Sequence, residues 1–152
     1  MLAFRVTVVH PERVSETEWF ATDQELAATP ADIERELHDA WLDFDSMDID
    51  AARTIISGHR ERPVNGRWFM TGRYPVELAV SGAESVNCDD PDGLGGVGVD
   101  NVTIDDRGMT ITSCYVGSLT ILGAHLSTTL VLAGRPTTVR RWPLGRWRPD
   151  HS

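Results

Sequence analysis

The sequence predicts an α+β fold: one antiparallel β-sheet of about five to seven strands, with two short N-terminal helices packed on one face. Two patterns lead to this expectation. Apolar residues follow a helical period in the first third of the chain and alternate with a period of two after residue 63. Tight turns separate the alternating segments, which is typical of antiparallel strands. A chain of 152 residues is also long enough to form one core without disulfides.

The amino-terminal third predicts one strand followed by two helices. Residues 4–9 are rich in β-branched side chains and predict the first strand. Thr29 and the proline after it form a helix start, and apolar residues recur at every fourth position from Ile33, so we expect a helix of about 14 residues. A second helix is expected from about residue 47 to residue 57, capped by Gly58.

The remainder of the chain predicts short strands joined by hairpins. Residues 76–80 alternate between apolar and polar side chains, and Asp106-Arg107-Gly108 predicts a hairpin tip. Asn65-Gly66 predicts a second hairpin turn. The other expected strands cover residues 102–105, 109–115, 120–122, 128–133 and 137–141. Helices at one end of the chain and strands at the other are the arrangement of an α+β domain.

The chain divides into residues 1–141, a single α+β domain, and residues 142–152, a tail rich in arginine and tryptophan. The tail has no periodicity, so it is either disordered or docked on the domain. Cys88 and Cys114 both lie in strand-like segments, which predicts two reduced, buried thiols.

The charge balance is strongly acidic, with 23 acidic side chains, 14 basic ones and a net charge of −9. All the basic side chains are arginine, which indicates the GC-rich genome of a bacterium. An acidic body repels phosphate backbones and anionic membrane surfaces, and it attracts basic proteins. We therefore expect no membrane partner and no nucleic acid partner for the body of the molecule.

Four carboxylates, those of Asp43, Asp45, Asp48 and Asp50, lie in the expected joint between the two helices. Carboxylates crowded into a short joint make a surface that steers a basic protein toward it. Solvated helix caps, and metal binding or catalysis, are the two alternatives for the same residues. We take these four aspartates as the candidate partner-binding residues.

A second acidic group, Asp89, Asp90 and Asp92, precedes the glycine-rich segment 93–98. The segment matches the G-x-G-x-x-G pattern of dinucleotide-binding loops, but a strand follows it where that chemistry needs a helix. We expect a flexible turn between strands. The three carboxylates could bind Ca²⁺ or Mg²⁺ weakly, since hard cations bind several oxygens on flexible loops. A solvated acidic turn is the simpler interpretation. No other cofactor is expected.

The tail interleaves arginine with tryptophan between Arg140 and Arg148. It can fold back on the chain's own acidic surface, stay disordered, or bind an external anionic partner through charge and stacking. Joining two protomers in a homo-oligomer is a further role for it.

The sequence carries no motif that identifies a family or names a catalytic residue. The leading hypothesis is a small cytoplasmic protein-binding module that docks a basic partner, in the manner of an immunity or accessory protein. We lean against an enzyme. The alternative is nevertheless a small carboxylate-based, metal-dependent or metal-free enzyme acting on a compact organic substrate, which predicts a deep pocket with a carboxylate beside a histidine.

Overall fold

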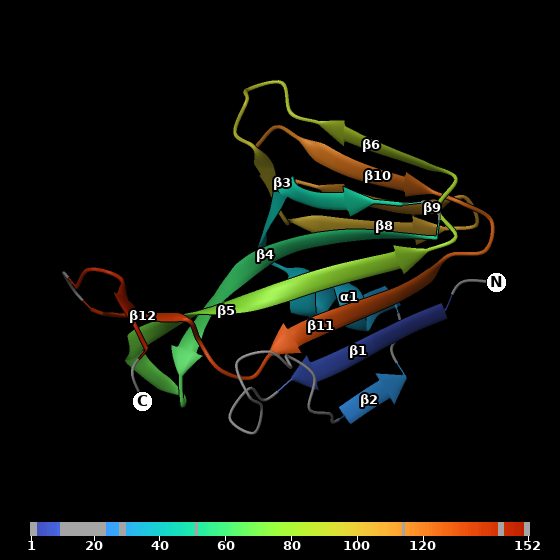
Figure 1. Cartoon of the computed structure of the whole chain (residues 1–152). Helices are drawn as coiled ribbons and strands as arrows, with labels where there is room; N and C mark the ends of the chain where they lie inside the picture. The colour runs from blue at the N-terminus through green and yellow to red at the C-terminus, as the bar shows by residue number, and fades with distance from the viewer. Residues whose placement is uncertain are drawn as a thin grey trace.

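The computed structural model describes residues 3–9, 24–27, 30–50, 52–113, 115–142 and 145–150, and most of these residues form β-strands (Figure 1). One helix, α1, spans Pro30–Leu37. The strands, in chain order, are β1 (Ala3–Val9), β2 (Gln24–Ala27), β3 (Trp41–Ile49), β4 (Arg53–Val64), β5 (Arg67–Ser81), β6 (Ser85–Asp89), β7 (Gly96–Gly98), β8 (Asn101–Asp105), β9 (Gly108–Thr112), β10 (Ser118–Leu122), β11 (Ser127–Ala133), β12 (Thr138–Arg141) and β13 (Arg148–Pro149).

The strands form two sheets. The larger sheet, sheet A, has the order β2-β1-β11-β5-β4-β3-β7, and β12 and β13 are attached to it through β5. The smaller sheet, sheet B, has the order β6-β10-β9-β8. Neighbouring strands are antiparallel except β1 and β11, which run parallel. In Figure 1 sheet B lies at the top, and α1 lies behind the strands of sheet A.

One continuous hydrophobic core joins sheet A, sheet B and the helix. Ile56, Leu78 and Leu130 are cross-strand partners on β4, β5 and β11, and each is at most 1% exposed. We call the side of sheet A that carries these three residues its inner face. Apolar residues of the other elements complete the same core: Ile33 and Leu37 from α1, and Val102, Met109, Ile111, Leu119 and Ile121 from sheet B. The opposite side of sheet A, its outer face, carries the residues that alternate with them.

The expected fold class is therefore wrong. The described chain is mainly β, with two sheets and one short helix, instead of one sheet covered by two helices. Sheet B takes the place that the second helix was expected to fill against sheet A. A short strand and a short helical segment place apolar residues inward with overlapping spacings, so periodicity alone does not separate them.

The helix expected over residues 47–57 is absent, because this segment contains the end of β3, a turn and the start of β4. The run Thr54-Ile55-Ile56 is β-branched, and β-branched residues fit a pleated sheet better than a helix. Asp50 makes the turn: its Oδ1 accepts hydrogen bonds from the backbone amides of Ala52 and Arg53, each 2.7 Å long. An aspartate that binds amides two and three residues later competes with helix formation.

The helix at residue 30 is confirmed, but it ends after eight residues instead of about 14. Asp39 follows with a positive φ of 65°, a left-handed conformation that stops the helix. The Asp39 amide donates to the Val99 carbonyl, and the Val99 amide donates to the Ala40 carbonyl, each over 2.8 Å. These bonds turn the chain into β3, so Trp41 begins a strand and does not extend the helix's apolar stripe.

Both expected hairpins are confirmed. Asn65 and Gly66 have φ angles of 50° and 72° and join β4 to β5, which is the geometry of a type I′ turn. Asp105 and Gly108 are register partners on β8 and β9, so Asp106 and Arg107 form a two-residue loop. The strands expected at residues 4–9, 76–80, 102–105, 120–122, 128–133 and 137–141 are also present, as is most of the one expected at 109–115.

Two segments extend beyond the core and together form what we call the arm. It consists of residues 60–74, at the tip of the β4–β5 hairpin, and residues 135–150 as far as they are described. Strand β12 pairs with β5 from Met70 to Arg73, and Arg73 lies 4.2 Å from the centre of the Trp147 ring. The tail thus packs on this hairpin (Figure 1, left).

Cys88 is an exposed, free cysteine on β6, so the expectation of a buried thiol is wrong for it. Cys114 and residues 10–23 lie outside the described residues. No helix in the described part of the chain is long and apolar enough to cross a membrane.

Replacing Leu78 by alanine should lower the free energy of unfolding by about 2–5 kcal/mol, because it leaves a cavity at the centre of the core. The matched control is Leu122→Ala on the outward side of sheet B, where the side chain is 39% exposed and the loss should be about 1 kcal/mol or less. Denaturant unfolding measures both. Equal losses would show that the two sheets do not share one core.

Candidate functional site

The four aspartates expected at a helix joint instead lie along β3 and in the turn after it. Asp43 is the register partner of Ser57 on β4 and of Gly96 on β7. Asp48 is the partner of Ile55. Ser57 and Ile55 alternate with the buried Ile56, so Asp43 and Asp48 belong to the outer face of sheet A.

A bulge in β3 sets the spacing of these carboxylates. Between Asp43 and Asp48 the chain advances five residues, whereas the paired segment of β4 advances only two. The hydroxyl of Ser46 holds the bulge: its Oγ lies 2.6 Å from the Asp43 carbonyl oxygen and accepts the Ser57 amide over 2.9 Å. The Asp45 amide donates to the Asp43 carboxylate over 2.9 Å. The bulge therefore displays exposed Asp45 between Asp43 and Asp48.

Glu77 of β5 joins this group and was missed by sequence reasoning. It is the register partner of Ser57, so Asp43, Ser57 and Glu77 form one cross-strand row on the outer face. The alternation of residues 76–80 was the available signal, since the polar member of that pattern had to face away from the core. We call Asp43, Asp45, Asp48 and Glu77 the acidic face.

Asp50 has a different role from the other three predicted aspartates. Hydrogen bonds from the Ala52 and Arg53 amides lower the pKa of the Asp50 carboxyl, and the nearby Arg53 charge acts in the same direction. The expected crowding, which would raise a carboxyl pKa, does not govern this residue. Asp50 is a turn residue.

Among the described residues, no cation lies within ion-pair distance of the acidic face, whereas acidic side chains near α1 and in the arm form ion pairs. Near α1, Glu36 pairs with Arg60 over 2.6 Å, and Asp32 pairs with Arg35 over 2.6 Å. In the arm, Glu61 pairs with Arg73 over 3.3 Å. Among the described residues, Asp43, Asp45, Asp48 and Glu77 form no such pair, so their charges project an uncompensated negative field.

The loop that contains Asp90 and Asp92 folds against the same end of β3. Both oxygens of the Asp90 carboxylate are engaged: Oδ1 accepts the Leu94 amide and Oδ2 the Gly95 amide, each over 2.9 Å. The Gly95 carbonyl in turn accepts the amide of Phe44 on β3 over 2.8 Å. Asp90 therefore fixes the glycine-rich turn, which joins two strands as expected.

The Ca²⁺ or Mg²⁺ site at Asp89, Asp90 and Asp92 stays a prediction. The described residues contain no group of three or more histidine, cysteine, aspartate or glutamate side chains arranged to hold a metal ion. Partial burial, together with the nearby Asp90 carboxylate, raises the pKa of the Cys88 thiol. A raised pKa disfavours the thiolate that nucleophilic catalysis or metal binding would need.

A histidine beside a carboxylate does occur, at the C-terminal end of α1. His38 Nδ1 lies 3.1 Å from an Asp39 carboxylate oxygen, and His38 Nε2 lies 4.0 Å from Asp100. Glu34 and Arg62 border the same hollow, whose volume is about 390 Å³. The hollow is open, and the His38 side chain is half exposed, in contrast to the deep pocket that the enzyme alternative predicts.

Comparison of the chain with protein-family models, with curated proteins and with solved structures finds no match. The geometry described above is therefore the only guide to function.

Replacing Ser46 by alanine should lower the free energy of unfolding by about 1–3 kcal/mol, because the partly buried Ser57 amide loses its acceptor. Ser85→Ala, on an exposed strand position, is the control and should change stability by about 0.5 kcal/mol or less. Denaturant unfolding compares the two. A Ser46→Ala loss no larger than the control would mean that the hydroxyl does not hold the bulge.

His59, where β4 enters the arm, should make stability depend on pH. Burial, followed by the Arg73 charge, lowers the pKa of His59 below its usual value of 6.5. As the pH falls below about 6.5 the unfolded chain takes up a proton that the folded chain resists, so stability falls through this window. His59→Gln should lose less stability than the wild-type protein between about pH 7.5 and pH 5. Identical pH profiles would contradict this.

Proposed function

We propose that the protein is a cytoplasmic protein-binding module whose acidic face docks a basic surface of a partner protein. The observation that carries the proposal is the unpaired state of the acidic face. Four carboxylates from β3 and β5 lie on or beside one side of sheet A, and no described cation pairs with any of them.

Coulomb repulsion explains why this arrangement favours a basic partner. Like charges on one side of a sheet repel each other, and their field extends about 8 Å into a solution of physiological ionic strength. A basic surface that approaches is steered by this field, and its arginines or lysines relieve the repulsion on contact. The association rate should therefore be high at low salt and fall as salt is added.

The position of the face on the sheet also supports binding. Asp43, Asp48 and Glu77 sit on strands whose other side belongs to the core, so their backbones are fixed before a partner arrives. The Ser46 hydroxyl fixes the bulge between the two aspartates in the same way. A surface that needs little rearrangement loses little conformational entropy on binding.

The test compares capture of basic proteins by three forms of the full chain. Wild-type protein should retain a basic protein from a bacterial lysate at low salt and release it at high salt, as read by mass spectrometry. The variant D43N/D45N/D48N should lose that protein, since it keeps the shape of the face and removes three charges. Asparagine preserves the acceptor that Asp43 offers to the Asp45 amide.

The matched control is E34Q/E84Q/D106N, which removes the same number of charges from α1, from the β5–β6 connection and from the β8–β9 loop. It should retain the partner, with an association rate within about threefold of wild type. If the control and the test variant bind equally, the effect belongs to net charge and the acidic face is not the site.

A further inference from the structure

The arm gathers most of the positive charge of the molecule, because it combines two arginine-rich segments that are far apart in the sequence. Nine of the fourteen arginines lie in residues 60–74 and 135–150, together with only two of the twenty-three carboxylates. The rest of the chain holds twenty-one carboxylates and five arginines. Pairing of β12 with β5 is what brings the two arginine-rich segments together.

The carboxylates near the arm do not neutralise it. Arg60, Arg73 and Arg135 have carboxylate partners at 2.6, 3.3 and 3.4 Å. The other six arm arginines have none within ion-pair distance among the described residues; these are Arg62, Arg67, Arg140, Arg141, Arg146 and Arg148. The Nε atom of Arg140 is buried without a hydrogen-bond partner.

Three of these unpaired arginines border one hollow. Arg141, Arg146 and Arg148 line it with Val139 and Gly145, and its volume is about 500 Å³. The Gly145 amide donates to the Arg141 carbonyl over 2.8 Å, which holds these two lining residues together. Three arginines that border one hollow offer guanidinium donors to carboxylates, which arginine can bind through two parallel hydrogen bonds.

Exposed aromatic side chains also lie in the arm. Trp68 is 79% exposed and Trp142 is 61% exposed, and the Phe69 carbonyl accepts the Trp142 amide over 2.8 Å. Tryptophan and arginine are the residues most enriched at the energetic centres of protein–protein interfaces. The tip of the arm therefore has the composition of a contact surface as well as the charge.

We propose that the arm docks on the acidic face of a second copy of this chain. The inference rests on the proposed function, because it names the arm as the basic surface that the acidic face accepts. The chain carries both complementary surfaces: unpaired arginines at the arm, and unpaired carboxylates on the outer face of sheet A. The reciprocal pair, with each arm on the other copy, is the closed two-fold arrangement.

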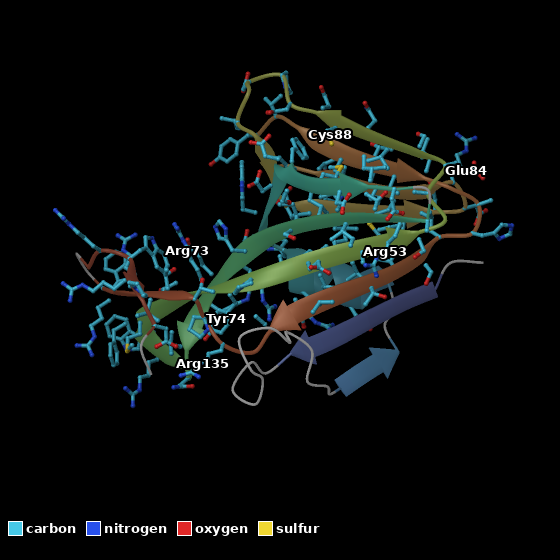
Figure 2. All side chains as sticks on the ribbon, in the orientation of Figure 1. Arg53, Arg73, Tyr74, Glu84, Cys88 and Arg135 are labelled. Atoms are coloured by element: carbon cyan, nitrogen blue, oxygen red, sulfur yellow. The ribbon has the colours of Figure 1, made fainter. Side chains whose placement is uncertain are left out.

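The position of the arm supports contact with another molecule. It projects from the sheets at the left of Figure 1, and Figure 2 shows side-chain nitrogens gathered at that end, near the labelled Arg73, Tyr74 and Arg135. None of the described arm arginines forms an ion pair with Asp43, Asp45, Asp48 or Glu77 of its own chain. A nucleic acid on the arm would meet the negative field of the rest of the chain, whereas the acidic face of a second copy gains from it.

Sedimentation velocity of the full chain tests the proposal. Wild-type protein should form dimers at about 0.1 M ionic strength and dissociate at about 1 M, where the screening length falls from about 10 Å to about 3 Å. Two variants should weaken the dimer about tenfold or more: R141E/R146E in the arm and D45R/D48R on the acidic face. The matched controls are R35E/R107E and E84R/D106R, which change net charge equally at exposed positions elsewhere and should leave dimerisation within about threefold of wild type.

An equimolar mixture of R141E/R146E and D45R/D48R is the decisive sample. In a mixed dimer, the unchanged arm of D45R/D48R meets the unchanged acidic face of R141E/R146E. At the second contact, the glutamate-bearing arm of R141E/R146E meets the arginine-bearing face of D45R/D48R. Both contacts are complementary, so the mixture should dimerise although each variant alone does not. Recovery in the mixture also shows that both variants are folded.

Three results would overturn the inference. Wild-type protein that stays monomeric at about 0.1 M salt and about 0.1 mM protein is the first. A monomer that instead binds a single-stranded oligonucleotide through Arg141 and Arg146 is the second. In either case, retention of a basic protein that D43N/D45N/D48N loses would leave the proposed function standing. The third result is a D45R/D48R variant that still dimerises while R141E/R146E does not. That outcome would show that the acidic face is not part of this interface.

Discussion

The antiparallel pairing of β4 with β5 is the interaction on which the rest of the structure depends. The two strands stay in register from Arg53 and Ser81 to the turn at Asn65 and Gly66, with one irregularity near the tip. Only the half of this hairpin that carries Ile56 and Leu78 is covered by the core. The other half is long enough to leave the core and to serve as the platform for the arm.

This single hairpin also separates the two charges of the molecule. At its covered end, Glu77 and its neighbours on β3 place carboxylates on the outer face, because their strand partners are committed to the core on the inner face. At its uncovered end, β12 lies along β5 and adds the tail arginines to those of the hairpin. Because β4 and β5 run continuously through both regions, the acidic and basic surfaces are held apart by a hydrogen-bonded ladder.

Small polar contacts decide where individual carboxylates point. Asp90 is the clearest example, since two backbone amides occupy its oxygens and it shapes a turn. Asp50 does the same between β3 and β4. Asp43 accepts one amide and remains at the outer face, while Asp45 has no described side-chain partner. Aspartates that look equivalent in the sequence thus divide into those that build turns and those that present charge.

Local signals in the sequence determined the individual turns and most of the strands. Asn65-Gly66 and the Asp106-Arg107 loop were predictable because few residues accept such backbone angles, and residues 128–133 because β-branched side chains alternate there. The helix expected after Met47 was wrong because spacing of apolar residues over one or two turns does not distinguish a helix from two strands around a turn. The existence of acidic segments was likewise visible, but Glu77 was missed.

Only the tertiary structure decided which of these segments lie together. Strand pairing places Glu77 beside Asp43 across Ser57, and it places Arg141 beside a hairpin about 70 residues earlier in the chain. Such pairings depend on which apolar faces fit together in one core, a property of all the strands at once. The sequence by itself therefore determined the net charge and the local turns. The division of that charge between a face and an arm was decided by the fold, since non-local packing selects strand partners.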